Sequence, residues 1–169
     1  MGKFFVPVGL SNRHIHLTEE HIEALFGKGY QLTPMKDLSQ PGQYACEEKV
    51  DVVGPKGTLK GVRVLGPARK ATQIEISLAD SYVLGVNPPI RDSGDLAGSP
   101  GAKIVGPNGE VTIDEGVIVA ARHIHMTPED AEQFGLADKD LVSVKVEGKR
   151  GLIFHNVLVR VSPSYKLEM

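Results

Sequence analysis

The chain has 169 residues, no tryptophan, and only 5% aromatic residues. With so few rings, its core must be built from aliphatic side chains, which favours packed β-structure. No apolar run reaches the roughly 18–20 residues that a membrane-spanning helix needs, so no membrane partner is expected. No signal-peptide pattern opens the chain, which predicts a cytoplasmic protein.

Cysteine and net charge are also scarce. The single cysteine, Cys46, cannot form an internal disulfide, which fits a reducing compartment. No local base accompanies this thiol, so we expect a structural residue in a strand or loop rather than a nucleophile. The net charge of −2 gives no electrostatic reason to expect nucleic acid as the main partner.

One short phrase is present twice. Residues 13–18 are Arg-His-Ile-His-Leu-Thr, and residues 122–127 are Arg-His-Ile-His-Met-Thr. In a strand, residues two apart point to the same face, so each histidine pair can converge on one metal ion. Because the flanking arginine and threonine are repeated as well, the duplication predicts a metal-binding role for four histidines: His14, His16, His123 and His125.

Both halves of the chain follow the same order of elements. Apolar strands are predicted over residues 4–10 and 116–121, each leading into a histidine phrase. The threonine that ends each phrase can cap a helix, and glycine stands near the expected stop of both helices. Carboxylates in the first turn favour these helix starts. Helices are therefore predicted over residues 19–27 and 128–135.

Strands and tight turns make up most of the remainder. Alternating residues around the turns at 54–57 and 147–149 predict two hairpins, and residues 87–101 are expected to form a loop. This spacing favours small barrels or sandwiches over a parallel α/β sheet. The predicted fold is mainly β, with two related halves whose histidine pairs face one another.

A second group of functional candidates lies between the two phrases. Strand alternation over residues 72–78 places Gln73, Glu75 and Ser77 on one face. Glu75 is either a solvated strand residue or the carboxylate that completes or bridges metal coordination. Arg69 and Lys70 follow a Gly-Pro turn, where a cation can reach a bound anion, and a guanidinium matches phosphate oxygens with two donors.

The two histidine phrases, with residues 66–77 between them, resemble the PduL-type phosphate propanoyltransferases, a family of phosphotransacylases. The resemblance covers essentially the whole chain and implies two small β-barrel domains with short capping helices. The implied first domain is 13–120. The second is 121–169 joined by the N-terminal strand 1–12. A two-metal site, normally zinc, is implied at the domain junction where coenzyme A binds.

Carried over by residue, the resemblance implies that His14 and His16 bind one zinc ion. It assigns His123 and His125 to the second ion. Glu75 would be the shared carboxylate and Arg69 the phosphate contact. The implied partners are coenzyme A, acyl phosphate and phosphate, and a homo-oligomer is a further expectation. The resemblance also implies propanediol degradation as the setting, with association of relatives with bacterial microcompartments.

The sequence departs from the family pattern at its ends. Relatives usually continue past residues 165–169 into a segment whose histidine helps to hold the second metal ion. Either the sequence is cut short here, or the second ion is held by fewer protein ligands and is the weaker of the two. His155 is the first candidate for a substitute ligand, although a histidine in such a strand-like run is more often structural or exposed. Microcompartment members carry an amphipathic extension before the first strand. Because the strand here is predicted within a few residues of Met1, the expectation is either a free cytoplasmic enzyme or a microcompartment enzyme whose extension is missing from this sequence.

The function predicted from these features is acyl transfer between coenzyme A and phosphate, by direct attack of phosphate at a two-metal site. A two-metal thioester or phosphoester hydrolase would use the same ligands, with hydroxide as the nucleophile. A non-catalytic metal- or nucleotide-binding barrel would keep the histidines but have no use for Arg69. A phosphate-dependent, CoA-forming assay and an Arg69 substitution would separate these alternatives.

Overall fold

The computed structural model describes residues 4–169, which form a mainly β protein with three helices. The chain divides into two compact units. The larger unit contains Ser11–Leu38 and Gly42–Ala120, and the smaller contains Ser39–Pro41, Ala121–Met169 and the described residues before Ser11. The assignment of independent domains to 13–120, and to 121–169 with 1–12, stays a prediction.

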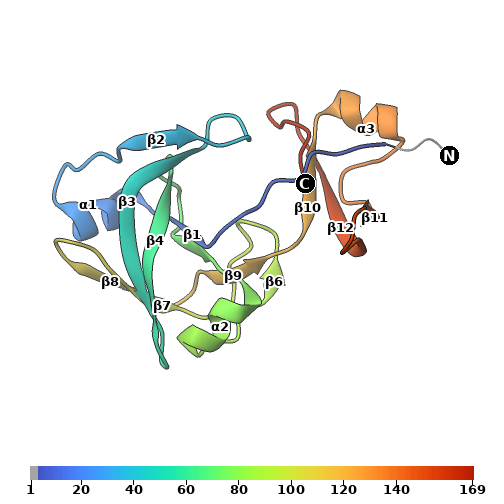
Figure 1. Ribbon diagram of the computed structural model, residues 1–169. Coiled ribbons are helices and arrows are strands. Elements are labelled where there is room, and N and C mark those ends of the chain that lie inside the picture. The colour runs from blue at the N-terminus through green and yellow to red at the C-terminus, as the bar shows by residue number, and fades with distance from the viewer. Residues whose placement is uncertain (1–3) are drawn as a thin grey trace. The chain divides into compact units, whose positions relative to one another are not determined.

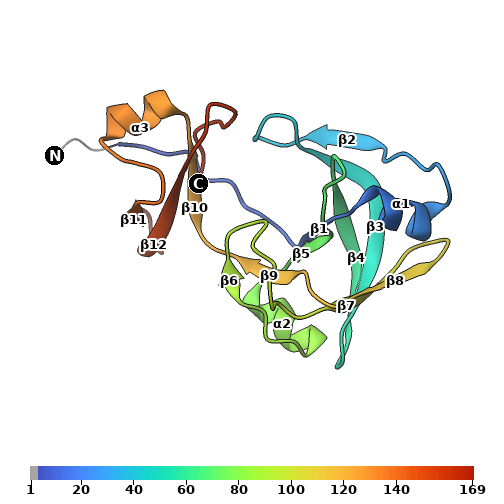
Figure 2. The same ribbon diagram turned by 180° about the vertical axis from the view of Figure 1, so that it is seen from behind.

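The larger unit is built on a curled, nine-stranded sheet with the order β6-β9-β5-β1-β4-β3-β7-β8, and β2 pairs with β3 (Figures 1 and 2). Over residues 4–169 this path has two ends, β6 and β8, so the expected closed barrel is not confirmed. Its strands are β1 (His14–His16), β2 (Pro34–Asp37), β3 (Tyr44–Val53), β4 (Thr58–Gly66), β5 (Gln73–Glu75), β6 (Ile90–Arg91), β7 (Ala102–Val105), β8 (Glu110–Ile113) and β9 (Val117–Ala120).

The first helix, α1 (Glu19–Phe26), confirms its prediction. The Thr18 side chain accepts a hydrogen bond from the amide of His21, and Gly27 ends the helix. A second helix, α2 (Leu78–Leu84), was not expected. The predicted strand over 72–78 is therefore too long. The Ser77 and Asp80 side chains each accept a hydrogen bond from the other's backbone amide, which starts a helix where strand alternation would continue.

The core of the larger unit is aliphatic, as the shortage of aromatic residues predicts. Ile15, Val64 and Ile74 on three adjacent strands are fully buried together. Cys46 on β3 is also fully buried, and burial raises the pKa of its thiol to about 11. The predicted placement of Cys46 in a strand or loop is confirmed, and a buried thiol with a raised pKa is a poor nucleophile.

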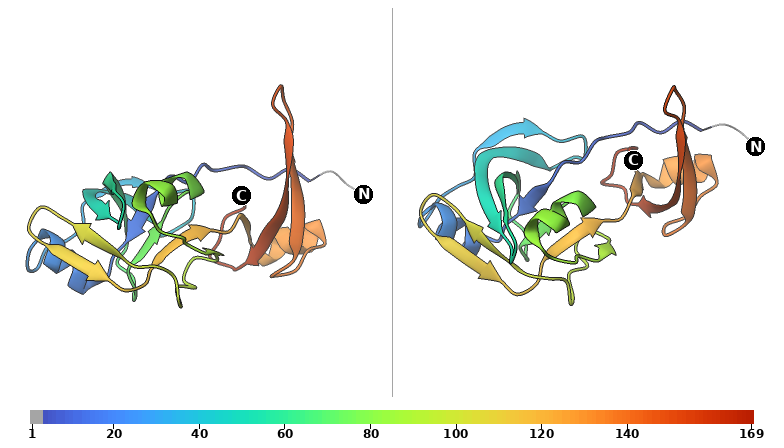
Figure 3. Two further views of the ribbon diagram at one scale, coloured as in Figure 1. Left: turned by 90° about the horizontal axis from the view of Figure 1, so that it is seen from below. Right: turned by 60° about the horizontal axis from the view of Figure 1, so that its bottom comes forward.

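The smaller unit contains a three-stranded sheet with the order β10-β12-β11. Its strands are β10 (His123–Met126), β11 (Leu141–Val146) and β12 (Leu152–Val161), and helix α3 (Pro128–Phe134) lies beside the β11–β12 hairpin (Figure 3). Thr127 and Asp130 form a reciprocal capping box, and Gly135 ends α3 in the left-handed conformation. The predicted second helix and second hairpin are confirmed.

The predicted strand over residues 4–10 is wrong in detail. Two backbone hydrogen bonds of 2.9 Å join Gly9 to Met169 and Met169 to Pro7, but the described segment forms no regular ladder. Proline lacks an N–H donor, which limits strand pairing at Pro7. Phe4 stacks on Phe134 with ring centroids 4.5 Å apart. Residues 1–3 of the implied N-terminal strand 1–12 lie outside the described residues.

No helix in the described part of the chain is long and apolar enough to cross a membrane.

Candidate metal centre and active site

The first histidine pair lies on a central strand of the larger unit. β1 pairs in parallel with β4 and antiparallel with β5, which places His14 opposite Glu75 and His16 opposite Gln73. Directly opposed residues of antiparallel strands project on the same face, with Cβ atoms about 5 Å apart. Two histidines and one carboxylate from distant parts of the sequence therefore meet on one face of the sheet.

His14, His16 and Glu75 form a tight cluster. One ligand atom from each side chain lies within 4.8 Å of the other two. The Nδ1 atom of His14 is 2.8 Å from the carbonyl of Asn12, so it donates its proton there. Nε2 of His14 lies 3.5 Å from Oε2 of Glu75. In neutral imidazole that Nε2 is an acceptor, and two facing acceptors need a positive centre such as a proton or a metal ion.

His16 contributes a ring nitrogen that makes no hydrogen bond within the described residues. Its Nδ1 is the one buried side-chain polar atom, among residues 4–169, without a hydrogen-bond partner. Burial, together with the charges of Arg69 and His14, lowers the pKa of His16, although Glu75 acts in the opposite direction. The ring is therefore neutral near pH 7, which is the form that binds metal.

Glu75 is the anionic member of the cluster. Burial raises the pKa of its carboxyl, but interactions with His14, His16 and Ser93 outweigh burial and lower it overall. The cluster thus combines neutral imidazole nitrogens with an ionised carboxylate, a donor set that suits zinc. The residues present fit a bound metal ion.

Arg69 approaches the same site from the loop that follows β4. Its backbone amide donates to the carbonyl of Leu17, which anchors the loop beside β1. Its guanidinium donates to Ser93 Oγ at 3.2 Å and to Gln43 Oε1 at 3.5 Å. The charge of Arg69 lowers the pKa of His16, so the two side chains interact. Lys70, the other predicted cation, is exposed.

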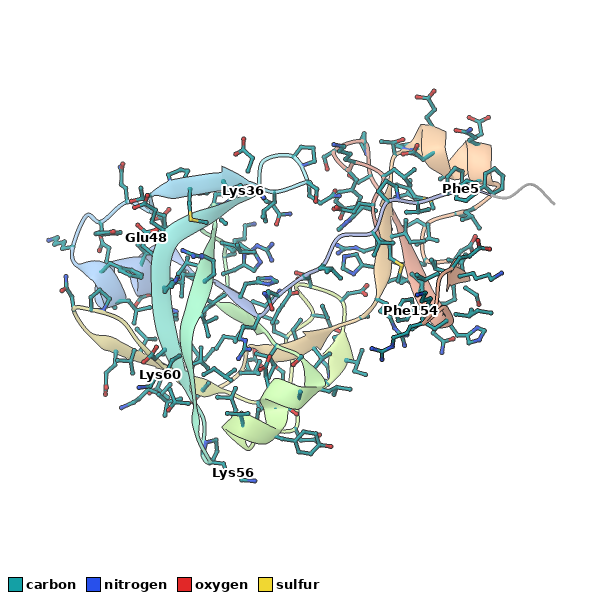
Figure 4. All side chains as sticks on the ribbon, viewed as in Figure 1. Phe5, Lys36, Glu48, Lys56, Lys60 and Phe154 are labelled. Atoms are coloured by element: carbon teal, nitrogen blue, oxygen red, sulfur yellow. The ribbon has the colours of Figure 1, made fainter. Side chains whose placement is uncertain are left out.

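A basic pocket of about 380 Å³ adjoins the start of the first histidine phrase. Its lining includes four cationic side chains, among them Lys60, which is labelled in Figure 4: Arg13, Lys49, Lys60 and Arg63. Arg13 also pairs with Asp80 at 2.9 Å. A pocket with this charge suits an anionic ligand. A larger pocket of about 500 Å³ is lined by Glu47, Glu48 and Asp51, and its acidic side chains make it less suited to an anion.

The second histidine pair, on β10 in the smaller unit, has a similar local geometry. Nδ1 of His123 is 2.7 Å from the carbonyl of Ala121, and the rings of His123 and His125 are 4.6 Å apart. Burial and the charges of His123 and Arg160 lower the pKa of His125 to about 4. Within residues 4–169, however, only His14, His16 and Glu75 form a group of three metal-capable side chains.

His155, the candidate substitute ligand, has the exposed position that is more usual for a histidine in such a run. His155 is exposed on β12, and its Nδ1 is 2.8 Å from the hydroxyl of Ser143. Tyr165 instead packs against His125, with ring centroids 4.4 Å apart. His155 is not part of the three-residue group found in the described chain.

Three contacts of this site were not anticipated. Gln73 donates to Glu75 Oε1 at 2.5 Å, and Ser93 Oγ lies within hydrogen-bonding distance of both Gln73 and Arg69. Strand alternation placed Gln73 and Glu75 on the same face, but it did not predict the hydrogen bond between their side chains. Nothing in the sequence singled out Ser93, which lies in the predicted loop.

Comparisons with known proteins identify the family of this chain. The sequence profile of the phosphate propanoyltransferase family matches residues 7–169. A phosphate propanoyltransferase from Thermotoga maritima is 60% identical over 164 residues, which cover 96% of this chain and 78% of the relative. One from Clostridioides difficile is 55% identical over 165 residues, covering 98% of this chain and 79% of the relative.

A third relative with the same name, from Rhodobacter capsulatus, is 56% identical over 164 residues, or 97% of this chain and 76% of the relative. Each match includes nearly all of this chain, so both histidine phrases and the Gly-Pro-Ala-Arg segment fall within the matched length. The chain is thus an acyltransferase, and it belongs to the phosphate propanoyltransferase family.

Proposed function

We propose that this chain interconverts acyl-CoA plus phosphate with acyl phosphate plus coenzyme A, using short acyl groups such as propanoyl or acetyl. A phosphate oxygen forms a bond to the thioester carbonyl carbon, and the carbon–sulfur bond breaks to release the thiol of coenzyme A. The observation that carries the proposal is the family match over residues 7–169. The cluster of His14, His16 and Glu75 supports it.

Two zinc ions per chain are part of the proposal. His14, His16 and Glu75 would hold one ion, His123 and His125 the other, and Glu75 would be shared. Bound zinc supplies a positive charge that favours the thiolate of coenzyme A and polarises a thioester carbonyl. The hydrogen bonds from Nδ1 of His14 and His123 to backbone carbonyls support this role, because they leave Nε2 of each ring as the ligand atom.

Arg69 would bind and orient the attacking phosphate. Its guanidinium is held at two nitrogen atoms by Ser93 and Gln43, so its planar face has a defined direction. A forked donor of fixed orientation can bind two phosphate oxygens and offset their charge. Direct attack needs no covalent protein intermediate, and the buried, protonated Cys46 is unsuited to form one.

The basic pocket supports coenzyme A as the acyl carrier, because this molecule carries several phosphate groups. Arg13 and Asn12 line the pocket and immediately precede His14 in the sequence. Phosphates bound there would anchor the carrier near the cluster, and the anchoring energy would position its reactive sulfur.

Duplication of one ancestral half remains part of the proposal, with each half contributing a barrel. It is supported by β1 and β10, which each pair in parallel with a long strand, β4 or β12, and each precede a threonine-capped helix. We also propose a cytoplasmic location, which fits a chain with one cysteine and hence no internal disulfide. The family resemblance alone supports three further proposals: homo-oligomer formation, microcompartment association and a role in propanediol degradation.

The test combines metal content with product analysis. The purified protein is expected to contain zinc and to release coenzyme A from propanoyl-CoA and acetyl-CoA only when phosphate is present, with acyl phosphate as the second product. His14→Ala and His123→Ala are each expected to abolish turnover, because the metal ion would lose one of the two imidazole ligands of that pair. The circular dichroism spectrum is expected to be retained.

A fully active, metal-free preparation would overturn the metal assignment. Phosphate-independent release of coenzyme A, with free carboxylic acid as the product, would favour the hydrolase instead. The matched control is His155→Ala, because His155 is exposed and lies outside the three-residue cluster.

A further inference from the structure

Gln73 is buried beside the cluster and uses both ends of its side-chain amide. Only 2% of its surface is exposed. Its Nε2 donates to Glu75 Oε1 at 2.5 Å and to Ser93 Oγ at 2.8 Å, while its Oε1 accepts from the amide of Gly94 at 2.7 Å. The bonds to Ser93 and Gly94 connect β5 to the loop that follows β6, and the bond to Glu75 lies within β5.

The chemistry of its neighbours determines which way the Gln73 amide points. The backbone N–H of Gly94 can only donate, so it needs the carbonyl oxygen of Gln73. The ionised carboxylate of Glu75 can only accept, so it needs the amide nitrogen. A flipped amide would put oxygen against carboxylate and nitrogen against N–H, losing both bonds. The side-chain amide of Gln73 therefore has a single favourable orientation.

Because of this fixed amide, the two carboxylate oxygens of Glu75 have different neighbours. Oε1 is held by Gln73, whereas Oε2 faces Nε2 of His14 at 3.5 Å. Glu75 thus presents a single oxygen to the centre of the cluster. Ser93 extends the network, because its hydroxyl oxygen accepts from Gln73 and from Arg69.

We propose that Gln73 and Ser93 are positioning residues that present Glu75 to a metal ion through one oxygen and tie that carboxylate to the phosphate-binding Arg69. The inference rests on the proposed function, since it assumes a metal ion at the cluster and phosphate at Arg69. Through Ser93, the orientation of the carboxylate and that of the guanidinium depend on each other, so metal and phosphate binding are coupled.

Zinc affinity tests the proposal directly. It is measured by competition with a chromophoric chelator in a His123→Ala background, so that the second histidine pair does not contribute. Gln73→Met keeps the side-chain volume and removes the hydrogen bonds, and it is expected to weaken zinc binding about 10–100-fold. In a Glu75→Gln background the same change should have little further effect, because the group that Gln73 orients is already altered.

Ser93→Ala tests the connection to Arg69. The KM for phosphate is expected to rise about tenfold, the equivalent of one hydrogen bond, and zinc affinity should fall as well. The matched control is Ser99→Ala, because Ser99 is buried in the same unit and bonds Leu96 and Gly116 instead of the site. Ser99→Ala is expected to lower stability without changing zinc affinity or the KM for phosphate.

Each outcome has a distinct meaning. If the protein with Gln73 intact binds no zinc, or if its binding survives His14→Ala, the proposed metal site fails. If zinc binds tightly and Gln73→Met binds it equally well, the positioning role fails while the metal site stands. If Gln73→Met lowers zinc affinity equally with Glu75 present and in the Glu75→Gln background, its effect is a general structural one, which would also overturn the proposal.

Discussion

At the scale of single residues, the site depends on side chains held from more than one direction. His14 is held by the carbonyl of Asn12 through Nδ1, while its Nε2 faces Glu75. Arg69 is held by Ser93 and Gln43. This fixed orientation suits the proposed role of Arg69, because a pre-oriented donor loses little freedom on binding an anion such as phosphate.

Arg69→Lys is therefore expected to damage catalysis more than folding. Lysine keeps the positive charge but loses the planar pair of donors, so phosphate would be bound without a defined orientation. We expect a loss of about 1–3 kcal/mol in transition-state binding, the range for a charge-assisted hydrogen bond. Steady-state kinetics with varied phosphate measure it. Lys70→Arg is the neighbouring control, and unchanged phosphate kinetics in Arg69→Lys would remove Arg69 from the site.

At the scale of elements, a hydroxyl side chain determines where each helix begins. Thr18, Ser77 and Thr127 cap α1, α2 and α3, and the last two form reciprocal capping boxes with Asp80 and Asp130. The caps also end the strands before them, because the cap residue accepts a hydrogen bond from the next turn. In this way Thr18 and Thr127 each end a histidine-bearing segment and start a helix.

Thr127→Ala is expected to lower the free energy of unfolding by about 1 kcal/mol, since the amide of Asp130 loses its hydroxyl partner. Thr127→Ser retains the hydroxyl and should keep most of the stability. Chemical denaturation followed by circular dichroism compares the two variants. Equal destabilisation of both would mean that the methyl group of Thr127, rather than its capping hydrogen bond, is responsible.

At the scale of the whole molecule, the two units carry unequal histidine pairs. The pair in the larger unit has Glu75 beside it, whereas the described residues provide no third metal-capable side chain in the cluster around His123 and His125. Fewer protein ligands leave more positions to water, and such an ion exchanges more readily. The repeat in the sequence therefore does not imply equal metal affinity.

Zinc titration is expected to reveal one tight and one weaker ion per chain. His14→Ala should remove the tight ion, and His123→Ala the weaker one, with activity depending on added zinc. Equilibrium dialysis with metal analysis measures both ions and is followed in parallel with turnover. Two ions held equally tightly would contradict the expected difference and would require a further ligand beside His123 and His125.

Much of the local structure could be predicted because it depends on neighbours in the sequence. The i, i+2 spacing placed His14 with His16 on one strand face, and the threonine caps predicted α1 and α3. Helix α2 was missed because residues 72–78 satisfy strand alternation up to Ser77, where side-chain hydrogen bonds to the backbone favour a helix. The strand over residues 4–10 was overestimated because apolar character alone does not supply a partner strand.

By itself, the sequence determined a mainly β, aliphatic protein, a repeated histidine phrase and the short list of residues capable of metal and phosphate chemistry. These properties follow from composition and from spacings of two to four residues. The tertiary structure decided which of those residues meet. Strand register brings Glu75 opposite His14, and the loop after β6 carries Ser93 to Gln73 and Arg69. Such contacts depend on the pairing of distant strands, for which local spacing carries no information.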